Sequence, residues 1–206
     1  MSTLTLRKRW SAQDGALSAL AMPVSVLTAV HEGHQHGTTV STITRISRRP
    51  QVLGVCLKPQ SVLARLATAE GRFAVNVLSG RQGHLAQYFA ESSRPDGAAQ
   101  FQGIDWRPAA YSRAPLFRGA LAHYDCRVVG RFQVGDHEVL LGAVVHADSS
   151  EGDHLVSRSG ELFAGALMPV TGNDGRTALG PGADLLDGAR PLTVPLTQPA
   201  KEDVLS

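Results

Sequence analysis

The sequence predicts a mostly β protein with peripheral helices, built as an antiparallel barrel. Short β-rich runs outnumber helix-like stretches, and most of them arrive in pairs joined by tight turns. None of these runs is followed by the Gly-x-Gly-x-x-Gly loop that opens the helix of a doubly wound dinucleotide-binding sheet. The chain has 206 residues, of which 43% are hydrophobic, so it can bury one substantial core. We therefore expect one domain over residues 1–170, followed by a Gly- and Pro-rich arm or disordered tail over 171–206.

The first half of the chain combines a hairpin with a strand, helix and strand in succession. Met22-Pro23 ends the first helical pattern because proline cannot continue a helix. Ser61 is a suitable N-cap for the second helix, and Gly71 ends it. We expect, in chain order, a helix over 11–21, a hairpin of strands over 24–30 and 38–43, a strand over 51–57, a helix over 62–69 and a strand over 73–78.

The second half of the chain is dominated by a long hairpin. Two β-rich runs cover residues 119–132 and 138–147, and Val134-Gly135-Asp136 between them is typical of a tight turn. Before this hairpin we expect a helix over 82–90 and a polar loop with Pro and Gly over 91–99. Paired strands of this kind favour an antiparallel sheet.

Charge and hydropathy argue against two classes of partner. The net charge of +2 comes from 20 basic and 18 acidic residues without a long run of either sign, so a nucleic acid is not expected as a partner. No apolar stretch approaches the roughly 20 residues that cross a bilayer, and the amino-terminal residues lack the pattern of a signal peptide. We expect no membrane partner and a cytoplasmic location.

Cysteine and histidine residues raise the question of a thiol or metal site. Cys56 and Cys126 each lie in an apolar run, which is typical of small buried hydrophobic residues, and two cysteines make no disulfide framework. His31, His34 and His36 fall within six residues, and such tracts can bind Zn²⁺ or Ni²⁺. A native site needs a rigid element and a fourth ligand, whereas this stretch is expected at a hairpin tip, so we predict no metal.

Several segments, taken in order, carry a resemblance to a known family. They are ALAMPVSVLTAV, GTTVSTITRIS and RRPQVLGVCL within residues 19–57, FAVNVLSGRQGHLAQYFA (73–90), FQGIDW (101–106), ALAHYDCRV (120–128) and VGDHEVLLGAV (134–144). Over roughly residues 15–168 the chain resembles the flavin-reductase-like proteins of the FMN-binding split-barrel superfamily. The resemblance implies an antiparallel FMN-binding split β-barrel and an NAD(P)H:flavin oxidoreductase that reduces FMN, or FAD, with NADH or NADPH as hydride donor. It also implies a homodimer with the flavin near the subunit interface, and a separate monooxygenase that receives the reduced flavin.

The expected flavin-ring contacts come from two strands. An isoalloxazine ring needs hydrogen bonds along its polar edge and apolar cover on its faces, which backbone N–H groups on a Thr- and Ser-rich strand can provide. The resemblance implies that Thr38, Thr39, Val40, Ser41 and Thr42 line the ring, with Ser47 nearby, and that Cys56 and Leu57, at the end of the strand over 51–57, are further cofactor contacts.

The remaining expected cofactor contacts concern the phosphate and the flavin tail. A lysine beside a serine at a helix start provides donors and positive potential, so Lys58 and Ser61 are the phosphate candidates; a solvated charge and a plain helix cap are the alternatives. The resemblance extends the cofactor contacts to Phe73 and Asn76, although an internal asparagine more commonly satisfies buried backbone groups. Arg158 occupies a position where the family often has an aromatic or basic residue, and it is either a phosphate contact or a solvated charge.

His137 is the candidate for cofactor chemistry. It follows Gly135-Asp136, and the resemblance implies that Gly-Asp-His lies near the nicotinamide site. An imidazole can present a donor or a cation to a carboxamide or a flavin edge near neutral pH. The alternative is a surface histidine after a turn, with Asp136 forming that turn. Two other functions remain open at this point: a flavin-binding electron carrier or sensor without NAD(P)H turnover, and a structural split barrel without a cofactor.

Overall fold

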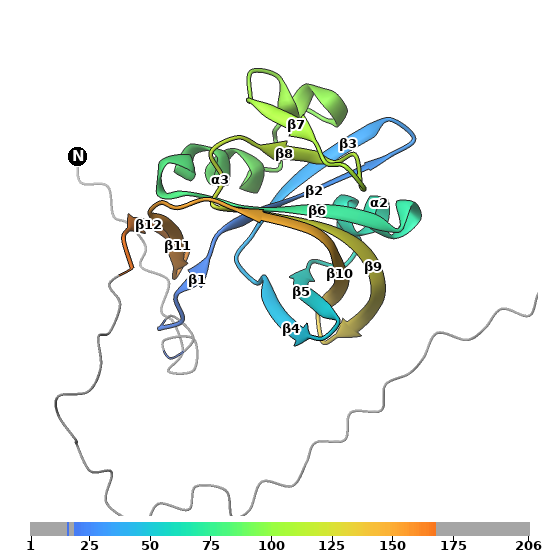
Figure 1. Cartoon of the computed structure of the whole chain (residues 1–206), viewed down its shortest axis with the longest axis horizontal. Helices are drawn as coiled ribbons and strands as arrows, with labels where there is room; N and C mark the ends of the chain where they lie inside the picture. The colour runs from blue at the N-terminus through green and yellow to red at the C-terminus, as the bar shows by residue number, and fades with distance from the viewer. Residues whose placement is uncertain (1–15, 17–18, 168–206) are drawn as a thin grey trace, which may run out of the picture. The chain divides into compact units, whose positions relative to one another are not determined.

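A computed structural model of the chain describes residues 16 and 19–167 (Figure 1). Most of the helix expected over 11–21, and the whole of the arm expected over 171–206, lie outside the described residues. Within them, the prediction of a mostly β fold with peripheral helices is confirmed. Every strand pair that the structure describes is antiparallel.

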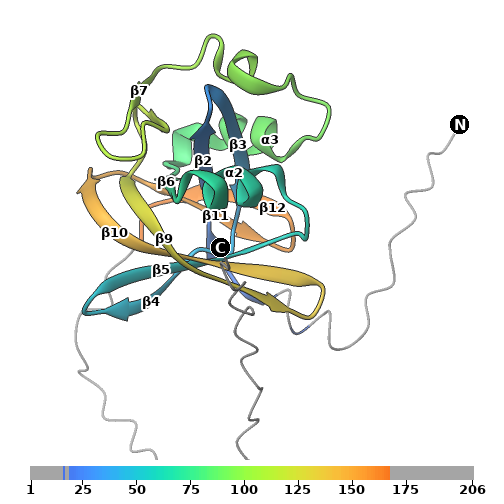
Figure 2. The same cartoon turned by 90° about the vertical axis from the view of Figure 1, so that its right-hand side faces the viewer.

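The main sheet has seven strands in the order β3-β2-β6-β9-β10-β5-β4. They are β2 (Ser25–His31), β3 (His34–Val40), β4 (Thr44–Arg48), β5 (Gln51–Leu57), β6 (Arg72–Val77), β9 (Ala122–Val134) and β10 (His137–Ser149). The long strands β9 and β10 curve strongly, so that β5 and β4 lie beneath the rest of the sheet (Figures 1 and 2). The two ends of the order, β3 and β4, are not paired with each other, so the barrel is open along one side.

Smaller elements surround the main sheet. The helices are α2 (Val62–Glu70) and α3 (Gly83–Ala90), with short 3-10 turns at Gly80–Gln82 and Gly97–Phe101. A three-stranded sheet consists of β1 (Met22–Pro23), β11 (His154–Arg158) and β12 (Glu161–Gly165), and a two-stranded sheet of β7 (Trp106–Pro108) and β8 (Pro115–Phe117). Among the described residues, no helix is long and apolar enough to span a membrane.

Both predicted hairpins form, but the first has its turn elsewhere than expected. Glu32 and Gly33 make the turn between β2 and β3 with φ angles of 50° and 79°, the left-handed geometry of a two-residue hairpin. As a result His34 and His36 lie in β3 and not in the loop that the sequence suggested. The polar residues were misread because β3 is an edge strand, and an edge strand tolerates half-exposed polar side chains.

Two apolar clusters make up most of the core. One fills the barrel and includes Leu27, Phe73 and Leu140 together with α2, whose residues Leu63, Ala64, Leu66 and Ala67 are buried against the strands. The other lies beneath α3, where the ring of Phe89 packs 5.3 Å from that of Phe117, centroid to centroid. The cores fix α2 and α3 on the sheet that carries β3.

Two glycines allow aromatic rings to approach the sheet closely. A Cβ atom at Gly37 of β3 would lie 2.6 Å from Cε1 of Phe89, and one at Gly142 of β10 would lie 2.5 Å from Cζ of Phe73. Neither distance leaves room for a side chain. Gly37 therefore sets how closely α3 packs on β3.

The side chain of Thr42 bridges the open side of the barrel. Thr42 follows β3, and its hydroxyl donates to the carbonyl oxygen of Cys56 at 3.0 Å and accepts from the backbone N–H of Cys56 at 3.1 Å. Cys56 belongs to β5, which is not a ladder neighbour of β3. The hydroxyl of Thr42 thus takes the place of a missing strand partner.

Candidate functional site

A cavity of about 740 Å³ opens beside the hydrogen bonds that join Thr42 to Cys56. It is bordered by β3, the end of β5, the start of α2, the end of α3, the loop after α3 and the start of β10. The lining residues are His36, Thr38, Thr39, Val40, Ser41, Thr42, Cys56, Leu57, Lys58, Ser61, Val62, Ala90, Ser92, Arg94, Pro95, Asp96 and His137. We refer to it below as the β3 cavity.

The β3 cavity brings together most of the site residues predicted from the sequence. The predicted residues that line it are Thr38, Thr39, Val40, Ser41, Thr42, Cys56, Leu57, Lys58, Ser61 and His137. They come from three parts of the chain that are distant in sequence, and the antiparallel pairing of β5 with β10 places His137 near Leu57. What each residue contacts in a ligand complex remains a prediction.

The edge of β3 presents backbone hydrogen-bonding groups to the cavity. Gly37 donates its N–H to Oε1 of Gln100 at 3.2 Å, and its carbonyl oxygen accepts from Nη2 of Arg94 at 2.6 Å. These partners show that the backbone groups of Gly37 point away from β2. Since antiparallel pairing alternates along a strand, the N–H and C=O of Thr39 point the same way. The Thr39 hydroxyl is already engaged, donating to the carbonyl oxygen of Ala86 in α3 at 2.8 Å.

Lys58 and Ser61 border the cavity at the start of α2. Ser61 occupies the N-cap position, but its hydroxyl makes no capping hydrogen bond. The first turn of α2 contains no acidic residue, so the partial positive charge of the helix N-terminus is not offset there. A hydroxyl, an ammonium group and a helix N-terminus of this kind are chemically suited to an anion.

His137 is the first residue of β10 and is about half exposed, at 46% of its side-chain surface. Its Nδ1 atom lies 2.8 Å from Oδ1 of Asp136. The hydrogen bond from His137 holds the pKa of the Asp136 carboxyl below its usual value. This arrangement fixes the ring through Nδ1 and leaves Nε2 for other partners.

Four predicted site residues lie outside the β3 cavity. Asn76 is fully buried, and its amide donates to the carbonyl oxygens of Val26 and Pro115 at 3.2 Å and accepts from the N–H of Phe117 at 2.7 Å. Phe73 is also fully buried, in the barrel core. Their placement gives both residues packing roles and does not support the predicted flavin contacts.

The other two residues belong to strands away from the cavity. Ser47 is in β4 opposite Val52, next to an irregularity in the strand pairing. Arg158 ends β11, opposite Glu161 of β12. Neither lines the β3 cavity, so their predicted cofactor contacts gain no support from this chain alone.

Sequence reasoning did not identify His36 and Arg94 as site residues. Arg94 belongs to the loop after α3 and contacts Nε2 of His36 at 3.1 Å and Oε1 of Gln100 at 3.2 Å. Burial is the main cause that lowers the pKa of His36 to about 4, and the positive charge of Arg94 contributes. The imidazole is therefore neutral near pH 7. A single arginine in a polar loop forms no sequence pattern, so only the fold reveals it.

The three histidines of the β2–β3 hairpin have separate partners. Nδ1 of His31 lies 2.9 Å from a carboxylate oxygen of Glu70, and Nε2 of His34 lies 3.3 Å from one of Asp96, while His36 contacts Arg94. Over residues 16 and 19–167, no three His, Cys, Asp or Glu side chains gather in a metal-binding arrangement.

The two cysteines differ in their surroundings. Cys126 is fully buried in the barrel core, and burial raises the pKa of its thiol to about 12. The expectation of a small buried hydrophobic residue therefore holds for Cys126. Cys56 is only partly buried and lines the β3 cavity.

Comparison of the sequence with known proteins identifies the family that it matches. Residues 17–165 match the model of the flavin reductase like domain. The chain is 36% identical over 142 residues to an NADH-dependent FAD reductase of Streptomyces globisporus, covering 69% of this chain and 75% of that protein. It is 34% identical over 149 residues to an NADPH-flavin oxidoreductase of Streptomyces viridifaciens, covering 72% and 77%.

A solved structure agrees with the sequence relatives. BorF, the flavin reductase component of a bacterial two-component tryptophan halogenase, superimposes with a TM-score of 0.70 at 30% identity, over 74% of this chain and 96% of that one. The family model spans the main sheet, both helices and every residue of the β3 cavity. On these grounds the chain belongs to the flavin reductase like family.

Proposed function

We propose that this protein is an NAD(P)H:flavin oxidoreductase that reduces FMN or FAD by hydride transfer and supplies the reduced flavin to a partner monooxygenase. The observation that carries the proposal is the β3 cavity, which combines an open strand edge, an anion-suited helix start and a histidine. Similar proteins are named as NADH- or NADPH-dependent flavin reductases, and one as a component of a two-component enzyme, which supports both donor and partner.

The residues present fit a flavin nucleotide. The outward backbone groups of Thr39 suit the polar edge of the ring, and Val40 and Leu57 offer apolar cover. Lys58 and Ser61 suit the phosphate. When bound, the flavin supplies the hydride-accepting chemistry, so the protein has to bind, orient and exclude water.

His137 has a positioning role in this proposal. Its ring is held through Nδ1 by Asp136, so Nε2 can bond to the carboxamide of the nicotinamide or to the flavin edge. Hydride transfer requires the nicotinamide and flavin rings to be in contact with water excluded. It needs no acid or base at the reacting atoms. The hydrogen bond to Asp136 reduces the freedom of the ring before substrate binds.

We also propose a homodimer with the flavin near the interface. Leu140 is fully buried in the barrel, so its neighbour Leu141 faces the outside of the sheet. Ile46 and Leu141 both lie over Gly54, and Phe132 and Leu141 both lie over Gly130, which makes an apolar outer face. Residue alternation in β10 puts His137 on this face, so the face continues to the β3 cavity.

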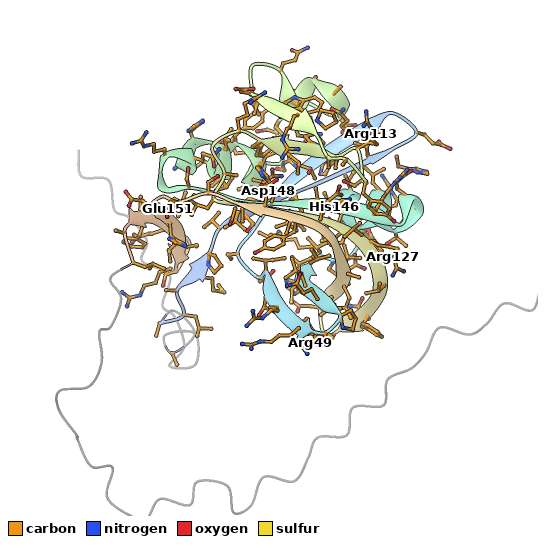
Figure 3. The ribbon with its side chains drawn as sticks, viewed as in Figure 1. Arg49, Arg113, Arg127, His146, Asp148 and Glu151 are labelled. Atoms are coloured by element: carbon orange, nitrogen blue, oxygen red, sulfur yellow. The ribbon has the colours of Figure 1, made fainter. Side chains whose placement is uncertain are left out.

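Charged side chains also lie on the outer side of the sheet. Arg49, at the turn between β4 and β5, and Arg127, on β9, are exposed on the outside of the curved sheet (Figure 3). An apolar centre with a polar rim is typical of a subunit interface.

Steady-state oxidation of NADH and NADPH, with FMN, FAD and riboflavin in turn, tests the proposed activity. We expect flavin-dependent oxidation of at least one nucleotide, and oxygen consumption by a flavin-dependent monooxygenase when the two proteins are mixed. A yellow protein that is inert to both nucleotides would indicate the carrier or sensor instead. A colourless protein without flavin affinity would indicate the structural barrel. The expected place of action is the cytoplasm, where reduced nicotinamide nucleotides are regenerated.

A further inference from the structure

Arg94 is fixed beside the β3 cavity by neutral groups. Its Nε donates to Oε1 of Gln100 at 3.2 Å, its Nη1 to the carbonyl oxygen of Glu91, and its Nη2 to the carbonyl oxygen of Gly37 at 2.6 Å. The guanidinium carbon also lies 6.0 Å from the centre of the Phe89 ring. These contacts come from β3, α3 and the turn after it, so they set the position of the guanidinium before any ligand arrives.

The positive charge of Arg94 has no anionic partner within ion-pair distance among the described residues. The nearest acidic group of the cavity, Asp96, is 79% exposed and pairs with His34 at 3.3 Å. Partial burial lowers the pKa of Arg94, which shows that the charge is poorly solvated. Asp96 attracts this charge only from beyond ion-pair distance, so an anion that binds next to the guanidinium would stabilise it further.

The hydrogen-bond network of Arg94, His36 and Gln100 has more donors than acceptors. Nη2 of Arg94 faces Nε2 of His36 at 3.1 Å, and Nε2 of Gln100 faces Nδ1 of the same ring at 3.2 Å. A neutral imidazole accepts at one nitrogen only, so it cannot accept both N–H groups. One N–H group is left over, and the carboxylate of the cavity, that of Asp96, is paired with His34. A ligand rich in acceptor oxygens would satisfy the network.

We infer that Arg94 binds the phosphate of the flavin nucleotide, with His36 and Gln100 as positioning residues that hold its guanidinium. The inference rests on the proposed function and adds a residue to Lys58 and Ser61, which line the same cavity. Among the described residues, Nη1 of Arg94 donates one of its two N–H groups to Glu91, which leaves the other for a phosphate oxygen. Arg94 therefore distinguishes flavin nucleotides from riboflavin, which carries no phosphate.

The test compares wild-type protein with Arg94→Gln, using FMN, FAD and riboflavin as acceptors. The amide nitrogen of glutamine takes the position of Nε of Arg94, so it can still donate to Oε1 of Gln100 while the charge is removed. We expect the KM and Kd for FMN and FAD to rise roughly 10- to 100-fold, the range for a lost hydrogen bond to a charged group, and those for riboflavin to change little. Arg118→Gln is the matched control, since Arg118 pairs with Asp105 and is 66% exposed outside this cavity.

The positioning role has a separate readout. His36→Leu removes the ring nitrogens, and we expect the KM for FMN to rise less than in Arg94→Gln but more than the KM for riboflavin. His36→Asn retains an acceptor and should recover part of the affinity. A merely structural role would weaken all three flavins alike.

The other possible results of these kinetic measurements would contradict either the role of Arg94 or the proposed function. If Arg94→Gln changes FMN and riboflavin equally, or changes neither, the inference is overturned while the activity stands. If it raises only the KM for the nicotinamide nucleotide, measured with riboflavin, then the phosphate belongs to that nucleotide and the flavin assignment is wrong. If wild-type protein reduces none of the flavins, the proposed function itself has failed.

Discussion

Thr42 makes a testable contribution at the scale of a single residue. Thr42→Val keeps the shape of the side chain but leaves the N–H and C=O of Cys56 without their partner. We expect the free energy of unfolding to fall by about 1–3 kcal/mol, the usual cost of unsatisfied groups, and the KM for flavin to rise. Thr42→Ser retains the hydroxyl and should behave like wild type in urea unfolding and in kinetics. Equal behaviour of the two variants would show that the link has no energetic role.

Individual residues also show how far sequence reasoning reaches. The contiguous stretch Thr38–Thr42 and the pair Lys58 and Ser61 form short motifs with chemical meaning, and all of them line the β3 cavity; their contacts with a flavin stay a prediction. Asn76 was assigned to the flavin, yet three buried backbone groups occupy its amide. Those groups come from β2 and from the chain around β8, so only the folded structure shows where the amide points. Arg94 went unnoticed for the same reason.

At the scale of elements, hydrophobic patterns in the sequence predicted best those strands and helices that are buried in the folded protein. The strand over 51–57 matches β5, and the helix over 62–69 matches α2 to within one residue, because both are buried and bounded by clear stop signals. The short strand β4 was missed since it is an exposed edge with little apolar pattern. The small sheet of β1, β11 and β12 joins segments from both ends of the domain, and local patterns carry no information on such pairing.

The junction of β2, α2 and β6 provides a pH prediction. Hydrogen bonds from His31 and from Arg72 keep the pKa of Glu70 below its usual 4.5. A carboxyl whose pKa is lowered on folding stabilises the protein above its unfolded pKa, and this contribution is lost as the pH falls through the folded value. We therefore expect Glu70→Gln to lower the free energy of unfolding near pH 7. The difference from wild type should shrink below a pH of about 4.5.

Urea unfolding of both proteins at several pH values measures this difference. Subtracting one from the other removes the contributions of Asp136 and Asp148, whose pKa values are also lowered. A difference that stays constant from neutral to acidic pH would contradict the role of Glu70.

At the scale of the whole molecule, packing inside the barrel depends on the close contact between Gly142 and Phe73. Gly142→Ala places a methyl group against Phe73 and the Cβ of Cys126, and we expect a loss of about 1–3 kcal/mol from overpacking. Calorimetric or urea unfolding measures it. Gly165→Ala is the control, since no atom of the described residues lies within 4 Å of a Cβ there. Gly142→Ala combined with Phe73→Leu should recover part of the loss, and no recovery would locate the strain elsewhere.

Subunit association is the other prediction at this scale. Ile46 on the apolar outer face is 55% exposed, and Phe163 in β12 is 49% exposed. We expect Ile46→Glu to convert a dimer into monomers, because a carboxylate would be buried at the interface. Phe163→Glu should leave the dimer intact in light scattering after size-exclusion chromatography. A monomeric wild type, or a dimeric Ile46→Glu, would exclude this face as the interface.

The unpaired flank of β3 has a further consequence. Bare strand edges are templates on which other chains can add, which is a route to aggregation. Here the side chains of Arg94 and Gln100 already cover the flank at Gly37, whereas the stretch from Thr39 to Ser41 borders the β3 cavity. A small molecule docked there would shield the protein from self-assembly each time it binds, and each departure of product would briefly expose that stretch again.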